Sequence, residues 1–167
     1  EFSDKPWHSK EETSKYTMLQ KSGKAIRYFW VNEVNSVITS PCPEKPWTHL
    51  KKGEMVEIEG LAWSGHGTIK GVDISFDGGD NWVEAKLKGL VLPKSWTRFS
   101  YIIKWDGKPM ILASRSYDDF GNIQPTIDEE TSAVGVESVY HRNAIVTWEI
   151  TSKGECNNVQ IRKHKKA

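Results

Sequence analysis

Apolar and polar side chains alternate with a period of two along several short segments of this chain. Between Val56 and Ala62 every second position is apolar or small, while Glu57 and Glu59 stand between them. The same period recurs at Val72, Ile74 and Phe76, at Phe99, Tyr101, Ile103 and Trp105, and at Ala144, Val146, Trp148 and Ile150. Because successive side chains of a strand point to opposite faces, this pattern predicts half-buried strands packed on a shared core.

Turn signals separate these segments at intervals that suit short strands. They combine glycine with residues that favour tight turns, in SGHG (64–67), DGGDN (77–81), WDGKP (105–109), DDFGN (118–122) and SKGE (152–155). Two earlier segments, Ala25–Val31 and Val34–Ser40, are rich in β-branched and aromatic residues and also predict strands. No segment has a convincing helical period. Seven to nine short strands from Ala25 onward therefore predict an all-β fold, an immunoglobulin-like antiparallel β-sandwich.

The first 24 residues are polar and lack a sustained period. They predict an extended N-terminal arm or linker over residues 1–24, followed by one sandwich domain over residues 25–167. The segment Pro41–Trp47 holds three prolines in seven residues, so it can be neither helix nor central strand and is interpreted as a rigid connector.

Charge and composition narrow the classes of partner. Lys and Arg total 23 against 22 Asp and Glu, which gives a net charge of +1 and no basic excess of the kind that nucleic-acid binders gather on one face. The one basic run, at residues 162–166, is interpreted as a solvated tail. No apolar run approaches the roughly 20 residues of a membrane helix. We therefore expect neither nucleic acid nor a membrane as a partner.

Two cysteines, Cys42 and Cys156, are compatible with one bridge or with two free thiols. Neither the Cys nor the His residues have the spacing of metal ligands, so the sequence predicts no metal site.

The stretch SFDGGDNW (75–82) is the most specific short motif. Asp-Gly and Gly-Gly supply the positive φ angles of tight hairpin turns, and the Asp77 carboxylate can accept hydrogen bonds from N–H groups further along the turn. The spacing resembles the Asp-box, Ser-x-Asp-x-Gly-x-x-Trp, of sialidase-type propellers and other β proteins. A propeller would repeat the box in each blade, and here it occurs once. We therefore assign Ser75, Asp77, Gly79 and Trp82 to a structural turn.

Longer stretches resemble the carboxy-terminal dimerisation domain of the sulfite oxidase family, whose members are molybdopterin-dependent oxidoreductases. These stretches are GLAWSGHGTIKGVDISFDGGDNWVEAKL (60–87), WTRFSYIIKWDG, SRSYDDFGNIQPT and HRNAIVTWEI, in the family's order. The segment Glu12–Pro41 is most similar to the branch that contains the molybdenum subunit of bacterial sulfane dehydrogenase, an enzyme of periplasmic sulfur oxidation.

The resemblance implies a sandwich that pairs with a second copy of itself and lines the edge of a substrate site. It implies no catalytic residue, metal or cofactor in this chain, because the family's molybdopterin and its cysteine ligand belong to a larger catalytic domain. Cys42 lies outside any context that resembles the ligand motif. We therefore expect either an inactive part of a longer sulfur-compound oxidoreductase or a stand-alone protein that kept only the scaffold. By the same resemblance, the longer enzyme is periplasmic and passes electrons to a cytochrome c.

The resemblance also singles out His66 and Lys70. In many family members an Arg from the loop after the WSG motif reaches the anion-binding pocket, where a guanidinium suits sulfite or sulfate. Here SGHG places His66 at or beside that position, and Lys70 is the next cation. Both are substrate-pocket candidates, and the departure from Arg favours a divergent member over one that acts on sulfite.

Two other functions remain to be weighed against this one. Eight Trp residues would suit a stand-alone immunoglobulin-like module that binds carbohydrate or protein, although the alternation predicts burial of Trp63, Trp105 and Trp148. An independent hydrolase is not supported: Asp118 and Asp119 are adjacent, and adjacent acids in a strand point to opposite faces.

Overall fold

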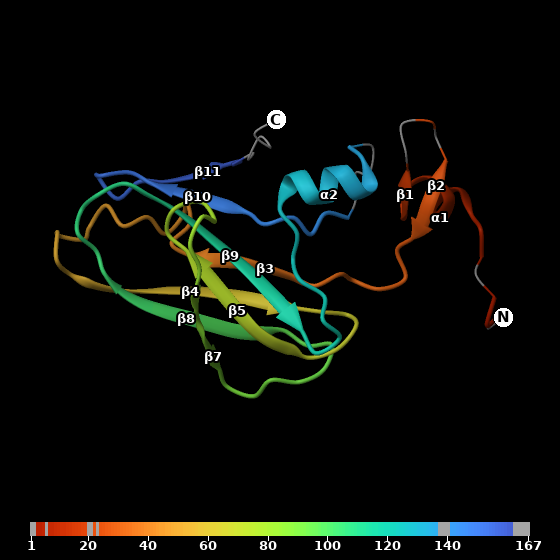
Figure 1. The fold of residues 1–167 in the computed structure, drawn as a ribbon, viewed down its shortest axis with the longest axis horizontal. Helices are drawn as coiled ribbons and strands as arrows, with labels where there is room; N and C mark the ends of the chain where they lie inside the picture. The colour runs from red at the N-terminus through yellow and green to blue at the C-terminus, as the bar shows by residue number, and fades with distance from the viewer. Residues whose placement is uncertain (1–2, 6, 20–21, 23, 137–140, 162–167) are drawn as a thin grey trace.

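The computed structural model describes residues 3–5, 7–19, 22, 24–136 and 141–161 (Figure 1). The predicted basic tail at 162–166 therefore lies outside the described residues. The elements in chain order are α1 (Lys10–Ser14), β1 (Thr17–Leu19), β2 (Ala25–Tyr28), β3 (Asn35–Ser40), β4 (Met55–Trp63), β5 (Ile69–Ser75), β6 (Val83–Glu84), β7 (Lys86–Lys88), β8 (Thr97–Lys104), β9 (Met110–Asp118), α2 (Ile127–Val134), β10 (Thr147–Ile150) and β11 (Cys156–Val159).

Two antiparallel sheets form the body of the protein. One has five strands in the order β11-β10-β9-β5-β6, and the other has four in the order β3-β4-β8-β7. This arrangement confirms the predicted all-β antiparallel sandwich. The predicted turns lie where the alternation stops, and Gly78, Gly107 and Gly154 adopt the positive φ angles that their turns require.

The arm contains more regular structure than its composition suggests. Strands β1 and β2 form a separate two-stranded antiparallel sheet, in which Thr17 pairs with Tyr28. The strand predicted from Ala25 is therefore real but shorter than predicted, and it pairs within the arm instead of joining the sandwich. The boundary predicted after residue 24 falls between these two strands, and the division into arm and domain stays a prediction.

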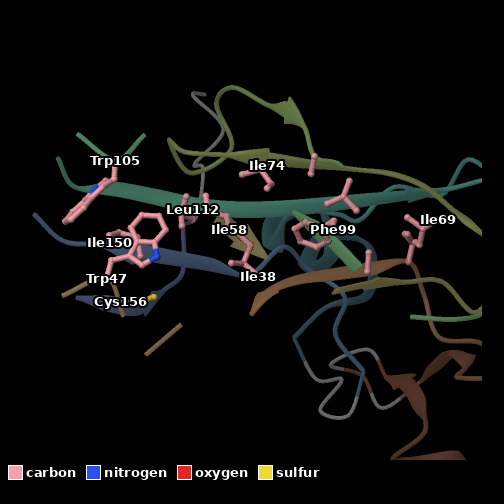
Figure 2. Close-up of a cluster of buried hydrophobic side chains, with 14 residues drawn as sticks. Ile38, Trp47, Ile58, Ile69, Ile74, Phe99, Trp105, Leu112, Ile150 and Cys156 are labelled. Carbon is pink, nitrogen blue, oxygen red and sulfur yellow. The ribbon is translucent and has the colours of Figure 1, made fainter. Parts of the chain in front are cut away.

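The core lies between the two sheets, where the inward side chains of the alternating strands meet (Figure 2). Ile58 of β4, Phe99 of β8 and Ile74 of β5 are completely buried. The tilted pair Trp47 and Trp105, with ring centroids 5.9 Å apart and an interplanar angle of 57°, closes one end of the core. Burial of each such side chain contributes roughly 1.5–3 kcal/mol, so the alternation read from the sequence is the main source of stability.

A polar bridge crosses this core between β3 and β9. Ser36 Oγ donates to Gln124 Oε1 at 2.6 Å and accepts from Ser114 Oγ at 2.9 Å. The Gln124 amide in turn donates to Asn35 Oδ1 at 2.8 Å. Because small serine side chains face each other here, the two sheets can approach closely, and the hydrogen bonds offset the cost of burying polar atoms.

Two of the three tryptophans predicted to be buried are only half-buried. Trp105 is 3% exposed, as predicted. Trp63 instead points away from the core and stacks on Trp96 at 4.8 Å between ring centroids, because the inward positions of β4 are those of Ile58 and Ala62. Trp148 lies at the edge of the core, where its Nε1 donates to the Ile38 carbonyl at 3.0 Å.

Helix α2 was not predicted, because its sequence has no apolar period. Only Glu130 and Val134 of its eight residues are buried. A capping box begins the helix: Glu129 N donates to Thr126 Oγ1 at 3.2 Å, and Thr126 N donates to Glu129 Oε2 at 2.8 Å. Its stability therefore comes from capping and from polar contacts, which hydrophobic periodicity does not reveal. No helix in the described part of the chain is both long enough and apolar enough to cross a membrane.

Gly60 provides a test of the packing between β4 and the core. A Cβ atom at this position would overlap the Phe99 ring and lie 2.5 Å from the Val37 carbonyl oxygen. We expect Gly60→Ala to lower the free energy of unfolding by about 1–3 kcal/mol through overpacking, measured by urea denaturation. Lys104→Ala, at an exposed strand position, is the control and should change stability by no more than about 0.5 kcal/mol. Equal stability of Gly60→Ala and the wild type would contradict this packing.

Candidate functional site

The SGHG loop joins β4 to β5 and is fixed by a buried carboxylate. Ser64 Oγ donates to Asp118 Oδ2 at 2.7 Å and accepts from the backbone N–H of His66 at 3.1 Å. Burial opposes ionisation of Asp118, but hydrogen bonds from Asn122, Ser64 and the backbone of Phe120 outweigh it and hold the pKa of Asp118 below its ordinary value. The loop is therefore tied to the end of β9.

Asp119 holds the other half of the loop. The backbone N–H of Thr68 donates to Asp119 Oδ1 at 2.9 Å, and the backbone N–H of Asp119 donates to the Thr68 carbonyl at 3.0 Å. A Cβ at Gly67 would overlap the Asp119 carboxylate and the Phe120 ring, so this close approach requires glycine. The two adjacent acids thus serve the loop and not a pair of catalytic carboxylates.

His66 lies against Glu33, a residue that sequence reasoning did not single out. His66 Nε2 is 3.2 Å from Glu33 Oε2, and the two side chains are 35% and 16% exposed. The contact is a hydrogen bond for neutral histidine and an ion pair for the protonated form. An oxyanion that bound at Nε2 would have to displace the Glu33 carboxylate. Lys70 is exposed on β5, and the side-chain partner of His66 described above is Glu33, not Lys70.

The Asp-box turn is a closed network of hydrogen bonds. Asp77 Oδ1 accepts from Ser75 Oγ at 2.7 Å, from Asp80 N at 2.9 Å and from Asn81 N at 3.0 Å. Ser75 Oγ accepts from the backbone N–H of Gly79 at 2.7 Å. Hydrogen bonds from the backbone and side chain of Asn81, and then from Ser75, hold the pKa of Asp77 far below its ordinary value.

Trp82 leaves the turn and stacks on Arg115 of β9. The guanidinium carbon of Arg115 lies 4.4 Å from the Trp82 ring centroid, and its Nε donates to Asp73 Oδ2 at 3.0 Å. A pocket of about 500 Å³ lies beside this stack and extends to the first turn of α2. Neither His66 nor Lys70 lines it.

The cysteines do not form a site for the molybdenum cofactor. Both Cys42 and Cys156 are free thiols. Burial, and then the nearby Cys42 and Glu44, raise the pKa of Cys156 to about 11, so this thiol stays protonated while metals bind the thiolate. The described residues contain no group of three or more His, Cys, Asp or Glu side chains that could hold a metal ion. The described residues therefore do not fit a molybdenum cofactor.

An ion pair between a buried glutamate and a half-buried arginine, also missed from the sequence, anchors α2. Arg142 donates to Glu130 Oε2 at 2.9 Å, and the backbone N–H of Asn143 donates to Glu130 Oε1 at 2.8 Å. The Glu130 side chain is 3% exposed. The pair His141-Arg142, noted in the motif HRNAIVTWEI, thus includes a structural arginine. Glu33 and Glu130 could not be found beforehand, because no local motif joins them to their partners His66 and Arg142.

Comparison with models of protein families shows which family this chain matches. Residues 27–148 match the Mo-co (molybdenum cofactor) oxidoreductase dimerisation domain. The chain belongs to this family. The matched span runs from β2 into β10 and includes both the SGHG loop and the Asp-box turn. These findings favour the dimerisation domain of sulfite oxidase-like enzymes over a stand-alone carbohydrate- or protein-binding module.

Several relatives of this dimerisation domain are known. The structure of sulfane dehydrogenase SoxCD from Paracoccus pantotrophus is 48% identical with a TM-score of 0.89, and the match covers 95% of this chain and 40% of that chain. Mitochondrial sulfite oxidase of Rattus norvegicus is 34% identical over 99 residues, and sulfite oxidase of Gallus gallus is 31% identical over 98 residues. Each of these matches covers 55% of this chain, but only 17% and 20% of the two relatives.

Asp77 gives the turn a pH dependence that can be measured. A carboxylate whose pKa is lowered by folding stabilises the native state above its unfolded pKa of about 3.9, and this contribution is lost as pH falls through the lower folded pKa. We expect Asp77→Asn to lower the urea midpoint at pH 6 and to flatten its decline between about pH 4 and pH 2. Asp4→Asn removes an exposed acid of the arm as a control. A pH profile of Asp77→Asn identical to that of the wild type would refute this role.

Proposed function

We propose that this chain is the self-associating, non-catalytic part of a molybdopterin-dependent oxidoreductase of the sulfite oxidase or sulfane dehydrogenase type. The observation that carries the proposal is the match to the dimerisation domain over residues 27–148, together with 48% identity to a sulfane dehydrogenase structure. The partner in self-association is a second copy of the chain, and the second partner is the molybdopterin catalytic domain of a longer parent enzyme.

The geometry supports a structural role. The acids that draw attention in the sequence, Asp77, Asp118 and Asp119, are engaged in hydrogen bonds that hold turns. The lowered pKa values of Asp77 and Asp118 keep these two carboxylates ionised and acceptor-only, so they are poor general acids. In the proposed enzyme, molybdopterin supplies the redox chemistry and is held by the catalytic domain, whereas this domain supplies shape and association.

His66 and Lys70 stay proposals for the edge of the substrate pocket. The support is the rigid placement of the SGHG loop by Asp118 and Asp119, which would present His66 to a neighbouring domain in one position. The contact with Glu33 gives the loop a polar rim, and it disfavours direct oxyanion binding at Nε2 because the Glu33 carboxylate already occupies that atom. A periplasmic location and a cytochrome c acceptor are further proposals, which rest on similarity to sulfane dehydrogenase.

Size exclusion with light scattering tests self-association directly. We expect a particle of about twice 19.0 kDa at micromolar concentration, because a stable twofold interface buries about 800 Å² per partner. A strict monomer at high micromolar concentration would contradict the proposal.

The same preparation tests the non-catalytic part of the proposal. We expect no stoichiometric molybdenum by elemental analysis and no oxidation of sulfite or thiosulfate by the isolated chain. Stoichiometric molybdenum together with turnover would overturn it.

A further inference from the structure

A cavity of about 500 Å³ lies outside the five-stranded sheet, between the Asp-box turn and the start of α2. Arg115 of β9 and Thr147 of β10 line its floor. Trp82 lines one side and the first turn of α2 the other. Sites for small molecules commonly enclose about 300–1,000 Å³, so the cavity is large enough for a ligand. The proposed function assigns no ligand to it.

Most of the wall of this cavity is apolar. Four isoleucines from separate parts of the chain contribute to it, together with Pro125: Ile123, Ile127, Ile145 and Ile161. Ile123 is 62% exposed, so a ligand that covered it would remove apolar surface from water, which is favourable. The wall therefore suits a ligand with an apolar body.

Arg115 is held in one orientation at the floor of the cavity. Its Nε and Nη2 both donate to Asp73 Oδ2, at 3.0 and 2.9 Å, and its guanidinium carbon lies 4.4 Å from the centroid of the Trp82 ring. A guanidinium carries five N–H donors in a fixed plane. Among the described residues, none accepts a hydrogen bond from Nη1. This amine is therefore placed to donate to a ligand, and a carboxylate is the acceptor that a guanidinium suits best.

The side of the cavity formed by α2 carries carboxylates. Asp128 is half-buried in the first turn of the helix and lines the cavity. A carboxylate has about four acceptor positions, so a contact within the protein leaves capacity for a ligand's ammonium group. Glu129 also lines the cavity, but its Oε2 accepts from the backbone N–H of Thr126 in the helix cap at 2.8 Å. Asp128 is therefore the better partner for a cation.

The charges around the cavity disfavour a ligand with a single charge. An anion at Arg115 would also meet the carboxylates of Asp73, Asp128 and Glu129, and like charges in a partly enclosed site are costly. A cation at Asp128 would meet the Arg115 guanidinium. A ligand that carries both charges gives each of them a partner, with its carboxylate at Arg115 and its ammonium at Asp128.

We propose that this cavity binds a small zwitterion with an apolar body, either an apolar α-amino acid or a dipeptide of such residues. The ligand's carboxylate accepts from Arg115 Nη1, its ammonium donates to the Asp128 carboxylate, and its apolar side chain lies among the isoleucines. The amino acid and the dipeptide share this chemistry and differ in the separation of their two charges.

Isothermal titration calorimetry of the isolated chain with matched probes tests this chemistry. The zwitterions are L-phenylalanine and L-leucyl-L-phenylalanine, and the tighter of the two identifies the length that fits. Its N-acetyl form lacks the ammonium and its amide form lacks the carboxylate. Each of these forms should bind about 10-fold more weakly than the zwitterion, because a charge-assisted hydrogen bond is lost.

Two results of this titration would overturn the proposal. One is that neither zwitterion binds at concentrations up to about 10 mM, which is weaker than the affinity expected of a fitting site. The other is that the tighter zwitterion binds no better than its own N-acetyl and amide forms, since the cavity would then not recognise the two charges.

Two substitutions should each remove the preference for one end of the ligand. In Arg115→Gln the zwitterion and its amide should bind equally, while the zwitterion keeps its advantage over the N-acetyl form. In Asp128→Asn these two preferences should be exchanged. A variant that only perturbs the fold would weaken every probe alike, so the exchange is specific to the contacts. Arg98→Gln and Asp4→Asn, at exposed positions outside the cavity, are the controls and should keep both preferences.

A third substitution tests the location without changing a charge. Ile145→Trp should fill part of the cavity and weaken the binding of every probe about 10-fold or more. Thermal melts verify that all variants fold. If Arg115→Gln does not fold, Arg115→Lys replaces it, because lysine keeps the charge but loses the planar fork and should also reduce the preference for the carboxylate.

Unchanged affinity in Ile145→Trp, or unchanged preferences in both Arg115→Gln and Asp128→Asn, would place the ligand elsewhere and overturn the proposal. These outcomes are independent of self-association, which light scattering measures separately.

Discussion

The packing of Phe99 on Gly60 in the middle of the four-stranded sheet is the constraint on which the rest depends. It fixes which side chains of β4 and β8 enter the core, since a one-residue change of register would exchange the two faces of each strand. With Ile58 and Phe99 inside, the acids of β4 and the bases of β8 must point outward. The chemistry of the outward positions of β4 and β8 is therefore a consequence of how the core is filled.

Polar side chains likewise determine the backbone conformation at the ends of the sandwich. Asp77 closes the hairpin after β5, and Asp118 fixes the loop before it. Each carboxylate is held ionised by donors from its own turn, so its function is to set backbone geometry. This is what a scaffold needs if it presents a rigid loop to a neighbouring domain. Catalytic chemistry, in this account, belongs to the domain that the parent enzyme adds.

The sequence revealed the strands well because each combines a period of two with glycine-rich turns, as in β4, β5, β8 and β9. Sequence patterns did not predict the elements whose stability has another source than hydrophobic alternation. Helix α2 depends on its cap and on Glu130, and β2 pairs with a strand of the arm. The strand pattern predicted burial of Trp63, but its position in β4, directly after the inward Ala62, makes it face outward. The partner of His66 could not be predicted, because Glu33 is 33 residues away and belongs to no shared motif.

Lysine cross-linking of a dimer formed from one isotopically light and one heavy copy tests the central claim most directly, because a light–heavy link must join two chains. The account predicts that such light–heavy links form, because the chain associates with a second copy of itself. The absence of any link between copies would contradict it.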